Sequence, residues 1–414
     1  MKGMARIKIW GILACVLSLA FIPVAEAGDG VYTNTVMHPD DETRLEWIES
    51  FERAPLARMD DELQFRAALR GSLSLLGYLD YTPSERDQGS CNNCWAWAGT
   101  GVVGIALNME RGIYDRLSVQ FISSCNTALS CCEGGWLSDF VSFYEIEGYT
   151  ISWSNANASW QNGNGRCNIS CESISTLPNY PLSSITLERI ATHGVGQAQA
   201  ISDIKNVLNQ GRAVWFGFFM STQEDWSSFN TFWNTQTDET SWDFDVSCGK
   251  PYTSGAGHAV LCVGYNDDDP NNAYWIMLNS WGTTANRPNG LFRVNMDINY
   301  DCSDSLGRPN LFWQTLDVEF DALTEIVYVE RFAFCGGLTP CYETIQEAIN
   351  TSGAEATIRI VEGRNFEDVT LNSAKNIRLE GGWDSTFTNR SSNTTIDSLT
   401  VNSGTVTVEF VVCQ

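Results

Sequence analysis

The spacing of apolar residues along the chain predicts an α+β unit over residues 72–320. Residues 96–107 form a nearly continuous apolar run, which predicts a helix buried on all sides. Residues 204–208 have helical spacing as well. Shorter apolar runs bounded by turn residues predict strands at 212–218, 258–265, 274–279 and 290–294. Helices in the first half and strands in the second half indicate a fold with a cleft between the two halves.

The regions on either side of this unit differ from it in residue composition and pattern. Residues 28–71 are polar and acidic, and the stretches 45–48 and 63–69 have the spacing of amphipathic helices. From residue 321 to 414, short β runs alternate with Gly and Asn turns, which is typical of the coils of a parallel β-helix. Ahead of these runs, residues 344–349 predict a short capped helix that covers the open end of the first coil.

Residues 410–414 directly follow a β run, and Cys413 has no obvious partner. Natural proteins normally cover open strand edges. We therefore expect this edge of the β-helix-like module to meet another copy of this chain, a cell-surface partner or further residues. The alternative is that the last strand folds back against the preceding unit.

Residues 1–27 have the pattern of a signal peptide. A basic start precedes an apolar run at 9–24 and a small-x-small cleavage site at 25–27. Lipid attachment at Cys15 is the alternative, but cleavage there leaves a very short apolar core. We expect an exported protein, secreted or periplasmic, that does not span a membrane.

The net charge and the cysteine content limit the possible partners and predict disulfides. The chain has 50 acidic and 25 basic residues, a net charge of -25, which argues against a nucleic-acid partner. There are 14 cysteines; losing Cys15 with the signal and leaving Cys94 free gives an even twelve. An exported chain with so many cysteines predicts disulfides, whose pairing the sequence leaves open.

Three residues in the order Cys, His, Asn predict a site for acyl transfer. Cys94 stands at the start of the predicted buried helix, where the helix N-terminus favours a thiolate, and Gln88 upstream offers an amide donor for an oxyanion. His258 is one of only three histidines and precedes a buried strand, and Asn279 follows the next strand. The alternatives are a disulfide between Cys94 and neighbouring Cys91, and a structural core histidine.

These residues lie in stretches that resemble the papain family of cysteine peptidases over about residues 72–318, namely 87–98, 132–135, 257–264, 274–282 and 289–294. The resemblance implies a two-lobed fold, with a helical left lobe and a β-barrel-like right lobe, that hydrolyses polypeptides without a cofactor or metal. It implies a set of roles: nucleophile Cys94, base and acid His258, orienting Asn279, oxyanion donor Gln88, shielding Trp281, and substrate-binding Gly134 and Gly135.

The same resemblance implies disulfides. It suggests Cys91–Cys132 and Cys248–Cys302, favours Cys125–Cys167, and leaves Cys131–Cys171, a local Cys335–Cys341 bridge and a free core thiol at Cys262. The chain departs from the family pattern at Asn92, Asn93 and Gly257. His258 comes 164 residues after Cys94, a spacing that implies insertions, for which the Trp-rich stretches 149–165 and 221–247 are candidates.

The leading functional hypothesis is an exported cysteine endopeptidase. Residues 28–71 are then either a prosegment that covers the cleft or an extension packed elsewhere. One alternative function is a silent homologue that binds a surface through residues 321–414, and another is a thioester-based acyltransferase. Asp267–Asp269 is interpreted as a solvated hairpin tip in preference to a calcium site.

Overall fold

The structure is a computed structural model that describes residues 35–67, 69–321 and 325–414. The predicted signal peptide lies outside the described residues. Two separate hydrophobic cores form, one from residues between Val36 and Phe320 and one from residues between Val327 and Ile396. Among the described helices, none combines the length and the apolar character that a membrane crossing requires.

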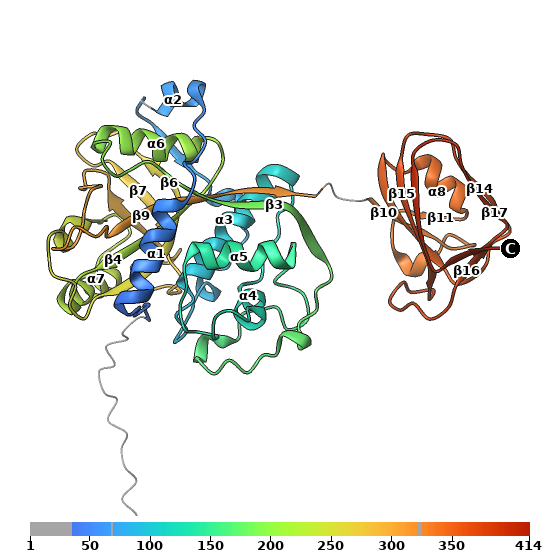
Figure 1. Cartoon of the computed structure of the whole chain (residues 1–414), viewed down its shortest axis with the longest axis horizontal. Helices are drawn as coiled ribbons and strands as arrows, with labels where there is room; N and C mark the ends of the chain where they lie inside the picture. Colours follow the sequence, from blue (N-terminus) through green and yellow to red (C-terminus); the bar gives the residue numbers. More distant parts are fainter. Residues whose placement is uncertain (1–34, 68, 322–324) are drawn as a thin grey trace, which may run out of the picture. The chain divides into compact units, whose positions relative to one another are not determined.

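The predicted central helix is α3 (Cys94–Arg111), and most of its residues are buried. It ends at Gly112, whose φ of 66° is the left-handed conformation that glycine adopts without strain. Helices α4 (Val119–Cys125) and α5 (Leu137–Glu147) pack against α3 and form the helical lobe. Cys94 is therefore at the buried N-terminus of the helix around which this lobe is built (Figure 1).

The second lobe is built on a mainly antiparallel sheet with the order β2-β3-β9-β4-β6-β7-β8-β5, and β1 pairs with β6. Its order does not close into a ring within the described residues. Every residue of β4 is buried, as predicted for 212–218. The strands are β1 (Ser72–Ser74), β2 (Tyr149–Ile151), β3 (Asn179–Arg189), β4 (Val214–Met220), β5 (Ser241–Trp242), β6 (Ala256–Asn266), β7 (Tyr274–Leu278), β8 (Leu291–Asn295) and β9 (Leu311–Phe320).

Several elements of this lobe were not predicted, of which β3, β9 and α7 are the longest. Strand β9 follows the run at 290–294 and lies in the interior of the sheet, between β3 and β4. Helix α7 (Gln223–Thr235) occupies the Trp-rich stretch that was interpreted as an insertion. Thr222 and Asp225 cap its N-terminus reciprocally, so a capping box was present in the sequence. The predicted helix at 204–208 is α6 (Gln197–Asn209).

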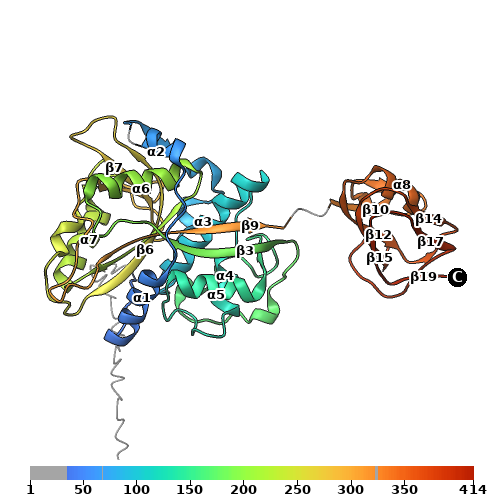
Figure 2. The same ribbon diagram turned by 45° about the horizontal axis from the view of Figure 1, so that its top comes forward.

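The two amphipathic stretches near the N-terminus are helices, α1 (Asp41–Arg53) and α2 (Asp61–Ala67). In both ribbon views α1 lies where the helical lobe meets the sheet (Figures 1 and 2). Its Trp47 stacks on Trp136 with ring centroids 5.0 Å apart, and Ile48 and Phe51 join the same core. The segment is therefore packed into the first folded part.

Residues 325–414 form an all-β arrangement with one short helix, α8 (Ile345–Thr351). Ile345, Ala348 and Ile349 of α8 are buried, as the predicted spacing required. All strand pairs are parallel and fall into sheets β11-β10-β12-β15-β18, β13-β16-β19 and β14-β17. The strands are β10 (Glu325–Val329), β11 (Cys341–Tyr342), β12 (Glu355–Val361), β13 (Gly363–Arg364), β14 (Asp368–Leu371), β15 (Asn376–Trp383), β16 (Thr394–Ile396), β17 (Ser398–Val401), β18 (Thr405–Glu409) and β19 (Val411–Cys413).

Five disulfides form among the described cysteines, and three of them match the expected pairs: Cys91–Cys132, Cys248–Cys302 and Cys335–Cys341. The other two expected pairs were wrong, because the partners are exchanged to give Cys125–Cys171 and Cys131–Cys167. Helix α4 ends at Cys125 and packs against the short turn at Cys171–Ser173, which brings those two sulfurs together. Both pairings close loops of similar length, so spacing alone could not separate them.

Candidate active site

Cys94 is the first residue of α3, and its side chain is fully buried and free of any disulfide. The disulfide alternative for Cys94 is therefore wrong, since Cys91 pairs with Cys132. The Cys94 thiol is hydrogen-bonded by backbone groups that include Ala259, the residue after His258 on β6. Strand β6 thus carries the predicted base to the N-terminus of the helix that carries the predicted nucleophile.

His258 is held from the side by Asn279, which directly follows β7. The two side chains are joined between His258 Nε2 and Asn279 Oδ1 at 2.8 Å. The Ser280 backbone N–H donates to the same Asn279 oxygen, so that oxygen accepts from the imidazole and fixes its tautomer, with the proton on Nε2. The Trp281 ring stacks on the imidazole with centroids 4.5 Å apart and an interplanar angle of 25°. His258 Nδ1 is buried without a hydrogen-bond partner among the described atoms.

Gln88 is fixed at both ends of its amide. Its Oε1 accepts a hydrogen bond from Ser280 Oγ at 2.7 Å, and its Nε2 donates to the Cys91 carbonyl at 2.8 Å. The second proton of Nε2 goes to the carbonyl oxygen of Thr35 at 3.1 Å. The amide that was predicted to bind an oxyanion therefore already holds a carbonyl oxygen from the chain's own N-terminal segment.

Residues 35–37 fill the space in front of these side chains; we call them the covering segment. Met37 is fully buried and pairs with Gly257 in a two-hydrogen-bond β-bridge, with N···O distances of 2.9 and 2.8 Å. On the other side, a Cβ placed on Gly134 would be 3.4 Å from Met37 Cγ. The covering segment thus lies between the predicted substrate-binding glycine and the residue that precedes His258.

Both titratable groups of the covered site are shifted toward their neutral forms. Burial raises the pKa of the Cys94 thiol to about 12, against the backbone hydrogen bonds that lower it. Burial also lowers the pKa of His258 to about 4, partly offset by its bond to Asn279. Burial thus disfavours a Cys94 thiolate and a His258 imidazolium while the covering segment is in place.

Gly134 and Gly135 are required to be glycine for different structural reasons. Gly134 has a φ of 105°, which an L side chain rarely adopts. A Cβ on Gly135 would come within 2.7 Å of the Trp95 ring, so this position is small because Trp95 packs against it. Gly134 thus borders the covering segment, whereas Gly135 makes room for a core tryptophan.

Two features of the site were missed by the sequence analysis. Arg86 is buried and donates from Nε to the Asn279 carbonyl at 3.2 Å and from Nη2 to the Trp97 carbonyl at 3.0 Å, which ties the Asn279 loop to α3. Helix α7 packs Phe229 and Trp233 against Trp281, each with centroids 5.7 Å apart. The Trp-rich stretch therefore supports the ring that covers His258.

Other candidate positions lie elsewhere. Asp267 is not simply a solvated tip: it accepts from the buried Lys205 ammonium at 2.8 Å and from the Gly71 N–H. Asp268 and Asp269 are exposed, as expected. His193 contacts the Leu311 carbonyl.

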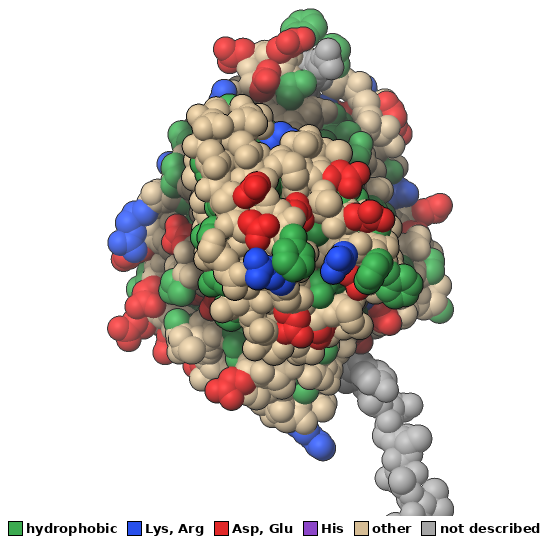
Figure 3. All heavy atoms as spheres, turned by 90° about the vertical axis from the view of Figure 1, so that its right-hand side faces the viewer, with side chains coloured by type: hydrophobic (Ala, Val, Ile, Leu, Met, Phe, Trp, Pro, Cys, Tyr) green, Lys and Arg blue, Asp and Glu red, His purple; other side chains and the backbone are tan. Residues whose placement is uncertain are grey.

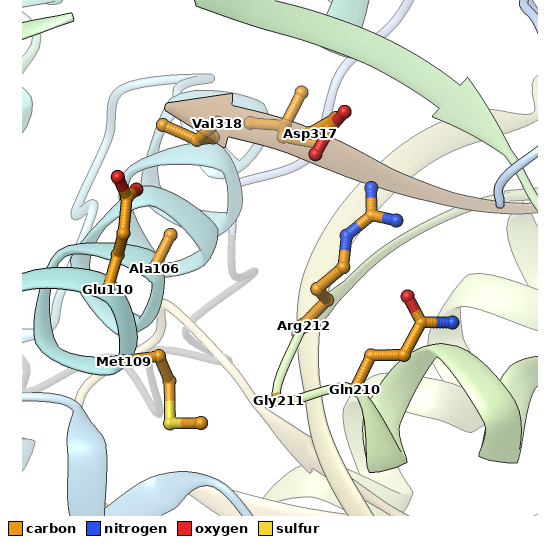
Figure 4. Close-up of a pocket in the computed structure, with 9 residues that line it drawn as sticks. Ala106, Met109, Glu110, Gln210, Gly211, Arg212, Asp317 and Val318 are labelled. Atoms are coloured by element: carbon orange, nitrogen blue, oxygen red, sulfur yellow. The ribbon is translucent and has the colours of Figure 1, made fainter. Parts of the chain in front are cut away.

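A hollow of about 310 Å³ lies near the far end of α3, roughly 22 Å along the helix from Cys94 (Figure 4). Arg212 points toward Asp317 there and forms an ion pair with Glu188 at 2.5 Å. The hollow contains none of the predicted site residues. It is lined by Ala106, Met109, Glu110, Gln210, Gly211, Arg212, Leu316, Asp317 and Val318.

Replacing Asn279 with alanine is expected to leave weak activity. The variant loses the acceptor that fixes the imidazole, but keeps the thiol and the base, so we expect kcat to fall roughly 10- to 100-fold with little change in KM. Steady-state kinetics on a peptide substrate measures both. An unchanged kcat would show that Asn279 does not orient His258; Asn266→Ala, at the far end of β6, is the matched control.

Comparisons with known proteins identify the family of this chain. The family model for papain family cysteine proteases matches residues 81–305, more than half of the chain. Cathepsin B-like CP3 of Giardia intestinalis is 28% identical over 218 residues, covering 51% of this chain and 64% of the relative. Bovine cathepsin S is 26% identical over 198 residues, covering 47% of this chain and 51% of the relative. This chain thus spans less than two thirds of the length of either relative.

Among solved structures, a digestive procathepsin L2 from Tenebrio molitor larval midgut aligns with a TM-score of 0.46 at 19% identity, covering 70% of this chain and 78% of that one. The match of the family model over more than half the sequence, with Cys94, His258 and Asn279 in order, decides the classification. The chain belongs to the papain family of cysteine proteases.

Proposed function

We propose that the chain is a cysteine endopeptidase with Cys94 as nucleophile and His258 as acid and base. The observation that carries the proposal is the 2.8 Å bond between His258 and Asn279, beside a thiol at the N-terminus of α3. Once water and substrate replace the covering segment, the charged pair is no longer penalised by burial. The helix N-terminus then favours the thiolate and Asn279 favours the imidazolium.

The reaction follows from the placement of these groups. The Cys94 thiolate attacks the peptide carbonyl, and Gln88 Nε2 with the Cys94 N–H holds the oxyanion, as Gln88 now holds the Thr35 carbonyl. The imidazolium gives its proton to the leaving amine, which leaves a thioester on Cys94. Neutral His258 then takes a proton from water, hydroxide attacks the thioester, and the carboxylic acid leaves as the ion pair re-forms.

Labelling with an epoxysuccinyl inhibitor tests this function. We expect a covalent adduct on Cys94 and loss of peptide hydrolysis; an unlabelled Cys94 in the activated protein would favour the silent, surface-binding alternative. Hydrolysis in the presence of added amines separates the acyltransferase alternative, in which an amine replaces water in the second step. Transfer products that exceed hydrolysis products would favour that alternative.

We also propose that residues 28–71 are an inhibitory prosegment. The covering segment occupies the cleft, and α1 is anchored by a fully buried ion pair between Arg44 and Asp304 at 2.8 Å. Removing the covering segment would uncover Cys94 and His258. The alternative of an extension packed elsewhere is disfavoured by the Met37–Gly257 bridge beside His258.

Arg44→Ala is expected to raise the labelling of Cys94 in the unprocessed chain. The variant loses two hydrogen bonds to buried acceptors, about 2 kcal/mol, which corresponds to roughly thirtyfold in the open population. The epoxysuccinyl labelling rate at neutral pH measures it. Arg53→Ala is the control, because Arg53 is on the same helix and pairs only with exposed Glu49; an equal effect of both variants would contradict a specific anchor.

For the remaining regions we propose residues 1–27 as a signal peptide, 72–320 as the peptidase domain and 321–414 as a β-helix-like module. Export is supported by the sequence pattern and the disulfides. The parallel sheets of the module support the β-helix interpretation. Side chains on the face shown in Figure 3 are mixed, with apolar groups standing among acidic and basic ones.

The last rung of the module supports a proposal of self-association. Val408 and Cys413 are in register with Leu379 and Ile396, which are fully buried, yet Val408 is 46% exposed and Cys413 is exposed. Positions that are interior in one rung are thus uncovered in the next. We propose that a second copy covers them. Sedimentation of the full chain and of a Val408→Lys variant tests this: a monomer in both cases would contradict it.

A further inference from the structure

A buried arginine on α1 occupies a pocket formed by residues of the sheet lobe. Arg44 is fully buried; Nη1 donates to Asp304 Oδ2 at 2.8 Å and Nη2 donates to Asn310 Oδ1 at 3.2 Å. Its Cζ lies 4.0 Å from the Tyr252 ring centroid and 4.9 Å from that of Phe219. A carboxylate, an amide oxygen and two aromatic rings are the groups that recognise a planar guanidinium.

The side chains that form this pocket are positioned by contacts outside α1. Asp304 Oδ1 accepts from the backbone N–H groups of Leu306 and Arg308, and the Arg308 side chain donates to Asp304 Oδ2 at 2.8 Å. Asn310 precedes β9, and its backbone carbonyl accepts from the Phe219 N–H of β4 at 2.8 Å. The carboxylate, the amide and the Phe219 ring are therefore fixed by the sheet and by the loop that precedes β9.

The arginine pocket adjoins the cleft. A Cβ placed on Gly257, the residue before His258, would be 2.8 Å from the Phe219 ring and 3.6 Å from Met37 Cε. The Phe219 ring therefore lies between the guanidinium and the backbone with which Met37 pairs. A peptide bound along Gly257 in place of Met37 would lie beside this pocket.

We propose that the pocket formed by Asp304, Asn310, Tyr252 and Phe219 is an arginine-binding subsite that accepts an arginine side chain of a polypeptide substrate. The proposal rests on the peptidase function proposed above and on the departure of α1. When Arg44 leaves, Asn310 Oδ1 loses its donor, and Asp304 Oδ2 loses one of its two donors and keeps only Arg308 Nε. Buried acceptors without donors are costly, so the vacated pocket favours a ligand with two coplanar N–H donors.

Lysine is a poorer ligand for the same pocket. Its ammonium is a compact, strongly hydrated charge and cannot lie flat against two rings while reaching two separate acceptors. Arg308 already neutralises Asp304, so the ligand gains through directed hydrogen bonds and ring contact more than through net charge. We therefore expect discrimination between arginine and lysine, and between arginine and its neutral, nearly isosteric analogue citrulline.

The test compares matched peptides on the activated wild-type protein. Each set carries arginine, lysine or citrulline at one position near the scissile bond, and kcat/KM is measured for each. We expect arginine to be preferred over citrulline by roughly tenfold or more at one position. Asp304→Asn is expected to bring that ratio close to one, whereas Asp297→Asn, an exposed carboxylate on the same lobe, keeps it. Equal rates for arginine and citrulline at every position, or a ratio that Asp304→Asn leaves unchanged, would overturn the proposal.

A second measurement does not depend on catalysis. In the full-chain Arg44→Ala variant the pocket is vacant, and millimolar methylguanidinium is expected to raise Tm by roughly 1–2 °C over the same concentration of methylammonium. An equal Tm shift with the two ions would overturn the proposal that this pocket binds a guanidinium group. If neither peptides are cleaved nor Cys94 is labelled, the peptidase proposal fails and this measurement alone decides the guanidinium site.

Discussion

Replacing Cys94 with alanine is expected to abolish peptide hydrolysis while the fold survives. The thiol is the only group at the N-terminus of α3 that can form the acyl intermediate, so we expect kcat/KM to fall by about four orders of magnitude or more. The structural cost is small, because the side chain makes no disulfide and alanine is a good helix former. Hydrolysis of a fluorogenic peptide and the circular dichroism spectrum measure the two effects.

Cys262→Ala is the matched control for this variant. Cys262 is also a free, buried thiol, and burial likewise raises its pKa to about 12, but it lies within β6 and bonds only to the Gly264 carbonyl. Its removal is expected to leave kcat unchanged and to lower stability by about 1 kcal/mol, since a small buried group is lost. Turnover by the Cys94→Ala protein would show that the nucleophile is another residue.

The parts of the site that were predictable are those with a local signal. The apolar run after Cys94 identified the buried helix, and the strands after His258 and before Asn279 followed from their apolar runs. Local patterns of this kind report which face of an element is buried. They place each residue on its element, and the order of elements then places the residues near one another.

Other parts depend on tertiary contacts that leave no local pattern. Arg86 holds the Asn279 loop through its backbone carbonyl, and any long cationic side chain at that position would have looked like a surface residue. The exchange of partners between Cys125 and Cys131 depends on how α4 packs. The covering segment has no strand alternation, yet Met37 forms a β-bridge, because a single bridge needs no repeating pattern.

In the Cys94→Ala protein, which has no thiolate to pair with His258, lowering the pH from 6.5 to 4 is expected to open the covering segment. The pKa of His258 is about 4 in the covered state against an ordinary value of about 6.5. Without a thiolate partner the imidazole is neutral in both states above pH 6.5, so the stability of the covered state is fully present there. As the pH falls from 6.5 through 4, the imidazole becomes protonated in the uncovered state but stays neutral in the covered state. The stability of the covered state is therefore lost. A shift of this size is on the order of 3 kcal/mol, or roughly a hundredfold in the open population.

Hydrogen exchange at the Met37 amide, which donates to the Gly257 carbonyl, measures this opening directly. We expect its protection factor, corrected for intrinsic exchange, to fall between pH 6.5 and 4, while the Phe218 amide in the β4–β6 ladder stays protected and reports that the lobe has not unfolded. The same experiment on the Cys94→Ala protein with the added change His258→Gln separates the imidazole from the Asp304 carboxylate, whose ion pair with Arg44 also stabilises the covered state. If this double variant loses Met37 protection over the same pH range as Cys94→Ala alone, the Asp304 carboxylate is the group that senses acid, and His258 is not.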